Sequence, residues 1–389
     1  MKRIEVLDGF RGFALLGILI VNVNFFNESL MAISLGGTPV EGWWNETIKA
    51  VSVLFVEGKF LLLFSFLFGY GAVILYSNAE AAGRKFTPMF IRRMMALLLF
   101  GILHGIFIWH GDILTSYALL GLLLLPFIRR SSKTLLVWSI VLTLLIPIMM
   151  TIFMVVGSLS GLDNTENMYT IDPSQIIAFQ QEDQLIYGEG TYTEITVKRI
   201  NDYIASLLNM ILFSPQILGT FLLGAYFAKR NFFHDINRKK SSFIKLGWIG
   251  GIAGIVFTFP RILTDSSNTL LEIGSVFIGS PMLMLSYVSF FSIVFMKHPK
   301  FLHFFTYPGK MAFTMYILQS VLCSLIFYSY GFGLYGKLTL WQTTAIALVI
   351  FGLQAIIGKM WLQRFKNGPL EYVWRTLYKG KLALKSKAQ

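Results

Sequence analysis

The sequence is poor in cysteine and in charge. Its single cysteine, Cys323, lies inside an apolar run, so no intramolecular disulfide can form, and no zinc-ligand spacing is present. Only 14% of the 389 residues are charged, whereas 55% are hydrophobic. Apolar runs of about twenty residues recur, whereas the polarity alternation of a membrane β-barrel is absent. The composition therefore excludes a soluble domain and predicts an all-α, polytopic integral membrane helical bundle.

The apolar runs predict ten transmembrane helices, which would place both termini on the same side of the membrane. The first run follows a basic N-terminus, as in a signal peptide, but Asp8 and Arg11 interrupt it and no small-residue cleavage site follows. We therefore expect it to be the first transmembrane helix. The approximate ranges are 11–29, 55–77, 92–110, 113–129, 134–158, 204–228, 243–263, 269–296, 311–330 and 338–361.

Basic residues are distributed unevenly between the two sides of this topology. With both termini in the cytoplasm, 27 of the 33 basic residues and 5 of the 20 acidic residues lie on the cytoplasmic side. The positive-inside rule therefore predicts cytoplasmic termini. Short cytoplasmic loops that face anionic lipid account for the formal net charge of +13. We expect the lipid bilayer as a partner and no nucleic acid.

One long polar stretch divides the chain. Residues 159–203 carry eight acidic residues and are expected to form an extracytoplasmic segment with two short helices, one started by Asp172-Pro173 and one by Thr193. This segment separates a five-helix half, 1–158, from a second five-helix half, 204–389, in which residues 368–375 suit a helix on the inner leaflet. No motif repeats between the halves, so an inverted-repeat transporter has no positive support.

The most informative stretch is a pair of predicted helices joined by a polar turn at residues 110–112. The first helix is expected to begin at Arg92-Arg93, which places His104 roughly 15 Å along it, near the middle of the bilayer. An intramembrane ionisable residue indicates a functional site, but a histidine hydrogen-bonded to another helix fits equally well. Since eight residues separate His104 from Asp112, we expect no direct contact between them, and a proton route only through water or other helices.

Polar residues near the start and inside other helices give weaker signals. Asp8 is expected to cap the first helix, with Arg11 one turn later. Gly9 and Gly12 would leave the backbone there open to an approaching anion, although a simple cap with an interfacial arginine is the plainer alternative. Asn22, Gln319 and Ser320 are expected inside membrane helices, where buried polar side chains need partners.

Six motifs keep their order over nearly the whole chain: Leu7-Asp8-x-x-Arg11-Gly12, Phe64-Ser65-x-Leu67-Phe68-Gly69, His104 with Gly111-Asp112-Ile113-Leu114, Tyr187 to Arg199, Gly309 to Ser320, and Gly368-Pro369-Leu370-Glu371. Together they resemble the bacterial YeiB-like family of unknown function. That family is similar to the wider transmembrane acyltransferase superfamily, which includes the lysosomal heparan-α-glucosaminide N-acetyltransferase. The resemblance implies a multi-pass protein of the bacterial cell membrane that passes an acyl group from cytosolic acyl-CoA to a small-molecule, lipid or glycan acceptor.

The resemblance also implies roles for residues. Asp8 and Arg11 match the opening motif of the superfamily, and Arg92 and Arg93 resemble the paired arginines that face CoA in its surface-acylating branch. These four are the expected cofactor-binding residues, and no metal is expected. The essential histidine of that branch is replaced here by Asn22, whose amide cannot act as a general base.

Either His104 replaces that histidine, with Asp112 as the second catalytic residue, or the chemistry differs. Asn22, Gln319 and Ser320 are the expected substrate-binding residues. From the residues alone, a membrane transporter or permeation pathway for a small metabolite or lipid, with His104 and Asp112 as relay groups, is almost equally well supported. The resemblance favours the acyltransferase. The oligomeric state stays open, a homo-oligomer included.

Overall fold

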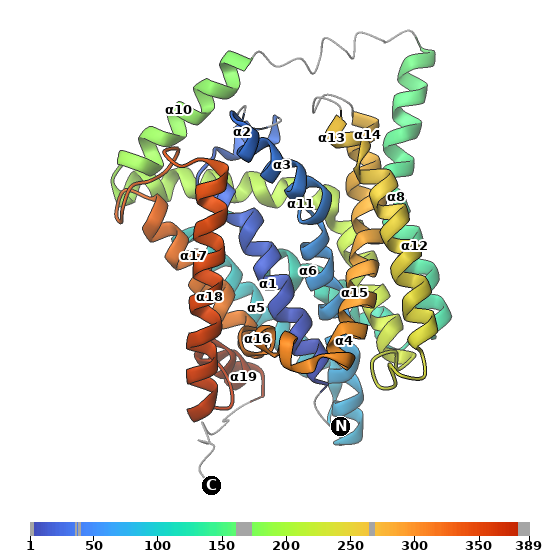
Figure 1. Cartoon of the computed structure of the whole chain (residues 1–389). Helices are drawn as coiled ribbons and strands as arrows, with labels where there is room; N and C mark the ends of the chain where they lie inside the picture. The colour runs from blue at the N-terminus through green and yellow to red at the C-terminus, as the bar shows by residue number, and fades with distance from the viewer. Residues whose placement is uncertain (1–3, 36, 38–39, 161–172, 264–268, 380–389) are drawn as a thin grey trace.

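The computed structural model describes residues 4–35, 37, 40–160, 173–263 and 269–379. These residues form helices and turns and no strand, which confirms the predicted all-α polytopic bundle (Figure 1). In chain order the elements are α1 (Glu5–Phe25), α2 (Leu30–Ser34), α3 (Trp43–Phe55), α4 (Lys59–Ala81), α5 (Phe86–Phe107), α6 (Leu114–Leu123), α7 (Leu125–Ile128), α8 (Ser132–Leu159), α10 (Pro173–Glu189), α11 (Tyr192–Lys229), α12 (Lys240–Thr258), α13 (Pro260–Leu263), α14 (Thr269–Ile273), the π-helix η1 (Gly274–Gly279), α15 (Ser280–Lys297), α16 (Pro299–Lys310), α17 (Ala312–Phe327), α18 (Leu340–Arg364) and α19 (Pro369–Lys379).

Fewer helices are long enough to cross a membrane than the sequence predicts. Within the described ranges, eight helices pass by length and composition, and the pair α16–α17, bent by 78°, adds a ninth candidate. The remaining predicted span, 113–129, is broken into the ten-residue α6 and the four-residue α7. Because α6 is only about 15 Å long, it covers roughly half of a hydrocarbon core.

Apolar side chains cover the outside of the bundle. Only 6% of the apolar window of α8 is buried inside the protein, and its Phe153 is 75% exposed. Such a surface is stable in contact with lipid and costly in contact with water. The chain is therefore a multi-pass membrane protein. The start of α1 and helix α19 lie at the same end of the bundle, which we call the terminal face (Figure 1).

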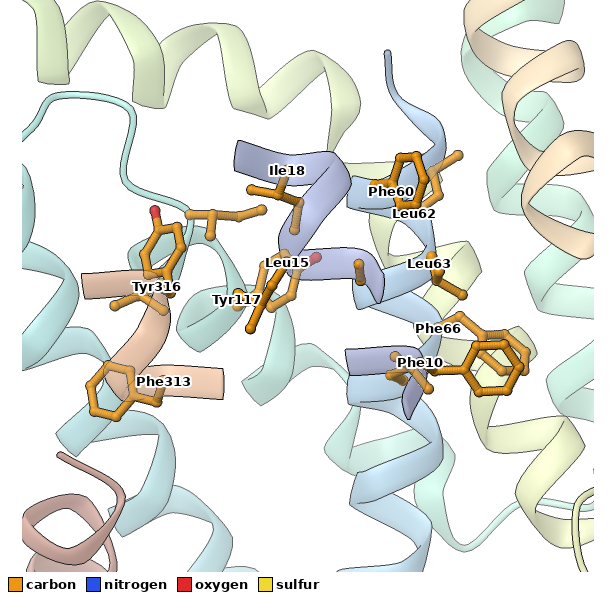
Figure 2. Close-up of a cluster of buried hydrophobic side chains, with 14 of the residues drawn as sticks. Phe10, Leu15, Ile18, Phe60, Leu62, Leu63, Phe66, Tyr117, Phe313 and Tyr316 are labelled. Atoms are coloured by element: carbon orange, nitrogen blue, oxygen red, sulfur yellow. The ribbon is translucent and has the colours of Figure 1, made fainter. Parts of the chain in front are cut away.

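Helix α1 occupies the centre of the bundle. It packs against α4, α16, α17 and α18. Figure 2 shows Leu15 and Ile18 of α1 between the α4 side chains Phe60 and Phe66 and the α17 residue Tyr316. The core thus connects segments from both halves of the sequence.

Two glycines bring α1 into backbone contact with α16. A Cβ on Gly12 would lie 1.9 Å from the carbonyl oxygen of Phe305, and one on Gly309 would lie 1.8 Å from that of Asp8. The expectation of an anion at this surface is wrong because α16 occupies it. Asp8 does not cap α1 either, since the helix begins at Glu5 and Asp8 lies in its first turn.

The polar segment after α8 continues directly into a membrane helix. Thr191 starts α11 through a capping box with Glu194, and the helix then runs for 38 residues without interruption. The predicted second short helix and the sixth predicted span are therefore one element, which contains Pro215 and crosses the bundle before it turns towards the terminal face (Figure 1). The predicted boundary between residues 203 and 204 falls inside it, whereas the expected start at Asp172 lies outside the described residues.

Candidate functional site

His104 and Asp112 are in direct contact. The Nδ1 of His104 lies 2.9 Å from the Oδ1 of Asp112, and the two residues are 1% and 4% exposed. The expectation that they are too far apart is wrong, because α5 ends at Phe107 and the chain reverses through non-helical residues 108–113. The reversal returns Asp112 to the last turn of α5.

The position of His104 along α5 also differs from the prediction. The helix begins at Phe86, before Arg92, so His104 lies in the last turn rather than in the middle. At about 1.5 Å per residue, it lies about 27 Å from the first residue. Gly101 permits the close approach of the reversed chain, because a Cβ there would lie 2.5 Å from the backbone nitrogen of Thr115 and 2.8 Å from Oδ2 of Asp112.

Backbone groups hold the Asp112 carboxylate in place. Its Oδ1 accepts a hydrogen bond from the N–H of Leu114 at 3.1 Å, and its Oδ2 accepts one from the N–H of Thr115 at 2.8 Å. These amides lie at the start of α6, where a negative charge is favoured. An ionised carboxylate only accepts, so it would hold the proton of a neutral His104 ring on Nδ1 and leave the lone pair on Nε2. Nε2 is buried and has no hydrogen-bond partner in the described part of the chain, so the pair is arranged to take up a proton there.

Two tyrosines from distant helices border this pair. The ring of Tyr316 in α17 lies 5.2 Å from that of His104, and its hydroxyl donates to the carbonyl of Gly111 at 3.4 Å. The hydroxyl of Tyr203 in α11 lies 2.7 Å from Oγ1 of Thr115. Sequence reasoning named neither as a site residue, because their proximity depends on helix packing rather than on spacing along the chain.

The paired arginines of α5 point to different surroundings. Arg92 is exposed. The guanidinium carbon of Arg93 lies 4.5 Å from the ring centroid of Trp374 and 5.8 Å from that of Tyr378, both in α19. The two arginines therefore do not form one site.

Arg93 has cationic neighbours from other helices. Arg11, which is paired with Asp8 at 2.8 Å, and Arg375 both act electrostatically on Arg93. Arg375 donates to Oδ1 of Asn367 at 2.6 Å. We call Arg11, Arg93 and Arg375, with the rings of Trp374 and Tyr378, the terminal arginine cluster. Two of the four residues predicted to bind a cofactor, Arg11 and Arg93, belong to this cluster, and Asp8 is paired with Arg11. Arg92 lies outside it.

The predicted substrate-binding residues form no hydrogen bond with His104 or Asp112 among the described residues. Gln319 donates from Nε2 to Oε1 of Gln354 at 2.8 Å, which ties α17 to α18. Ser320 donates to the carbonyl of Tyr316 in its own helix at 3.4 Å. Asn22 is half-buried in α1. Their predicted role in binding a substrate stays a prediction.

A metal cluster and a surface groove are two alternatives to this site. Among the residues with described positions, no group of three or more His, Cys, Asp or Glu side chains could hold a metal ion. A groove of about 600 Å³ between α16 and α18 is lined by residues that include Lys300, His303 and Lys359. It contains no residue of the His104–Asp112 pair or of the terminal arginine cluster. The candidate site is therefore defined by the chemistry of His104 and Asp112 and not by that groove.

Known proteins similar to this chain are described as uncharacterised. A family described as "Protein of unknown function (DUF418)" matches residues 227–381. "Uncharacterized protein YxaH" of Bacillus subtilis is 36% identical, over 96% of this chain and 94% of its own length. "Uncharacterized protein YeiB" of Escherichia coli is 26% identical over 97% of this chain and 96% of its own length. An uncharacterised 39.9 kDa protein of Bacillus acidopullulyticus is also 26% identical, over 97% of this chain.

Proposed function

Since the chain belongs to the YeiB-like family, we propose that it transfers an acyl group from acyl-CoA to a hydroxyl or amine of an acceptor. The observation that carries this proposal is the buried His104–Asp112 pair, in which Nε2 of His104 has no partner in the described residues. A carboxylate that orients Nδ1–H and leaves Nε2 open is the arrangement of a general base.

His104 would act twice in the reaction. Its Nε2 takes the proton of the acceptor hydroxyl or amine while the oxygen or nitrogen attacks the thioester carbonyl carbon. The new ester or amide bond forms, the carbon–sulfur bond breaks, and the imidazolium returns the proton to the departing CoA thiolate. Asp112 keeps the ring in one orientation and stabilises its positive charge between the two steps. The amides of Leu114 and Thr115 keep Asp112 itself in place.

The terminal arginine cluster suits the nucleotide end of acyl-CoA. Guanidinium groups bind phosphate oxygens bidentately, and aromatic rings such as Trp374 stack on bases. Arg93 and His104 are both on α5, about 17 Å apart along its axis. This spacing would place the phosphates at the terminal face and the thioester near His104, with the extended arm of CoA between them.

The predicted orientation gives the transfer a direction. The positive-inside rule assigns the terminal face to the cytoplasm, where acyl-CoA is available. His104, in the last turn of α5, lies towards the other side. The protein would then act in the bacterial cell membrane on a small-molecule, lipid or glycan acceptor at the membrane or beyond it.

Acyl-CoA binding and turnover by the purified protein test this function against transport. We expect the protein in lipid nanodiscs to bind acetyl-CoA and, with membrane extract as the acceptor source, to release free CoA thiol and incorporate the labelled acetyl group. Asp112→Asn should bind acetyl-CoA and release little thiol, because an amide does not stabilise the imidazolium. Failure of the wild-type protein to bind acetyl-CoA or other acyl-CoA compounds would contradict the proposal and favour transport of a small metabolite or lipid.

A further inference from the structure

Buried polar atoms without partners are concentrated beside His104. In the described residues, eleven buried side-chain nitrogen or oxygen atoms lack a hydrogen-bond partner. Eight of these atoms belong to His104, Trp109, His110, Asp183, Arg199 and Tyr328. Unpaired buried polar atoms are costly and rare in folded proteins. Their concentration at one place indicates a binding site.

Of these groups, Arg199 costs the most free energy to bury without partners. Its side chain is fully buried, and its Nη1 donates to the carbonyl of Ile106, near the end of α5, at 3.2 Å. Its Nε and Nη2 have no partner in the described residues. A buried positive charge is normally balanced by a negative one. Arg199 is therefore suited to bind an anion with its two remaining donor groups.

The acidic residues near Arg199 are already paired with Lys198. The Nζ of Lys198 lies 2.9 Å from Oδ1 of Asp183 and 2.8 Å from Oδ1 of Asp202. The hydroxyl of Tyr187 donates to the second oxygen of Asp202 at 2.7 Å. These bonds orient both carboxylates towards Lys198, so neither forms a hydrogen bond with Nε or Nη2 of Arg199, although the four charges together sum to zero.

Uncharged hydrogen-bonding groups lie around the guanidinium. The carbon of this guanidinium lies 5.7 Å from the ring centroids of Tyr192 and Tyr328. Tyr328 is fully buried, and its hydroxyl has no partner among the described residues. His110 is buried, and neither of its ring nitrogens has a partner there. Burial lowers the pKa of His110 from 6.5 to about 4, so the ring is neutral at neutral pH and offers one donor and one acceptor.

These groups connect to the His104–Asp112 pair by direct contacts. The carbonyl that Arg199 binds belongs to Ile106, in the same last turn of α5 as His104. The ring of Trp109 lies 6.4 Å from that of His104 and stacks on Phe26 at 4.4 Å. Phe26 in turn lies 5.9 Å from Tyr328. Arg199 and His104 are therefore linked through the last turn of α5 and through the two stacked rings.

We propose that Arg199, Tyr328 and His110 bind a carboxylate or phosphate group of the acceptor and thereby present its hydroxyl or amine to Nε2 of His104. The inference rests on the proposed function and names its substrate class: acceptors that carry an anionic group. Binding of the anion itself requires no acyl transfer, so it can be measured separately.

The test uses substitutions that separate binding from folding. Tyr328→Phe removes only a hydroxyl that has no partner among the described residues, so it should leave the unliganded protein as stable as before, or more stable. The matched control is Tyr117→Phe, which removes an equally buried hydroxyl that lies 2.6 Å from Oγ of Ser65. This control should lower stability and leave anion binding unchanged. Arg199→Lys keeps the charge and loses the planar fork.

Thermal unfolding of the purified protein is measured with added inorganic phosphate, acetate or chloride at equal ionic strength. We expect phosphate or acetate to raise the Tm more than chloride does, and the more effective anion identifies the acceptor group. The apparent Kd should rise about tenfold or more in Tyr328→Phe and Arg199→Lys and stay unchanged in Tyr117→Phe. Equal effects of all three salts, or equal affinities in Tyr328→Phe and Tyr117→Phe, would overturn the proposal.

A kinetic measurement separates this proposal from the proposed function. With acetyl transfer as the assay, Tyr328→Phe should raise the KM for the acceptor several-fold and leave the KM for acetyl-CoA unchanged. If the protein transfers no acyl group but binds the anion through Tyr328 and Arg199, the proposed function fails while the anion site stands. If transfer occurs with unchanged acceptor KM in Tyr328→Phe, the anion site fails.

Discussion

The carboxylate of Glu371 accepts a hydrogen bond from the backbone N–H of Phe313 at 2.8 Å. It also accepts hydrogen bonds from the N–H of Thr314, at 3.2 Å, and from its hydroxyl. These amides begin α17, directly after the 78° bend from α16, where backbone N–H groups have no helical partner. Helix α19 therefore caps the break in the bent pair, and the same helix carries Trp374 onto Arg93.

Removal of this cap should destabilise the protein. We expect Glu371→Ala to lower the free energy of unfolding by about 2 kcal/mol, because buried amides lose a charged acceptor. The control is Glu272→Ala, since the Glu272 side chain is 53% exposed and lies 3.8 Å from Arg261. It should change stability by less than about 0.5 kcal/mol. Thermal unfolding in detergent measures both, and equal losses would contradict the capping role.

The contact between α1 and α16 should not tolerate a methyl group. A Cβ on Gly12 would meet backbone of α16 at 1.9 Å, whereas one on Gly71 in α4 would meet nothing within 4 Å. We expect Gly12→Ala to lower the Tm and the yield of folded protein, since backbone cannot move aside as a side chain can. Gly71→Ala should be neutral or raise stability by up to about 1 kcal/mol. A Gly12→Ala variant as stable as Gly71→Ala would show that the helices are farther apart.

Acidification should destabilise the protein through His110. Its pKa is about 4 in the folded protein and 6.5 ordinarily, with burial as the main cause. Between these values the unfolded chain binds a proton that the folded protein does not, so stability falls as the pH drops from about 6.5 towards 4. Its charged or titratable neighbours, Asp202, Lys198, Arg199 and His104, are unchanged in His110→Asn.

That variant should therefore show a smaller loss of Tm between pH 7 and about pH 4.5 than the wild-type protein does. The comparison isolates His110 from every other titrating group. Identical pH profiles of the two proteins would contradict a neutral, buried His110.

The two arginines of α5 should differ in their effect on acyl-CoA binding. Arg93→Ala should weaken binding at least tenfold, because Arg93 belongs to the terminal arginine cluster, whereas Arg92→Ala should change it less than twofold. Arg93→Lys should restore binding only partly, since an ammonium group lacks the planar fork. Isothermal titration with acetyl-CoA measures the three Kd values. Equal losses in both alanine variants would indicate a general effect of surface charge.

The sequence predicts the helices well and their ends poorly. Long apolar runs must form helices in a bilayer, so the architecture follows from composition. The end of α5 cannot be predicted from the sequence. Residues 107–109 are all apolar, and no glycine or proline among them would stop a helix. The predicted helix therefore runs to residue 110 and hides the reversal that joins His104 to Asp112.

The candidate site was predictable only in its individual residues. His104 and Asp112 were identifiable because ionisable groups are rare in membrane helices. The partners of Arg93 were not identifiable from the sequence. The indole N–H of Trp374 donates to the carbonyl of Arg93, but the two residues are 281 positions apart. The bond between Gln319 and Gln354 was not predictable either, because spacing along one helix does not show which residue of another helix faces it.

The most direct test of the account compares His104→Gln with His104→Ala in the acetyl-transfer assay and in thermal unfolding. Glutamine can still bond to Asp112 but cannot act as a base, so His104→Gln should keep its expression, its Tm and its affinity for acetyl-CoA and lose transfer at least a hundredfold. His104→Ala should lose transfer to the same extent and be less stable. A His104→Gln variant that is both stable and fully active would contradict a catalytic His104 and leave it a structural link between α5 and the chain that follows.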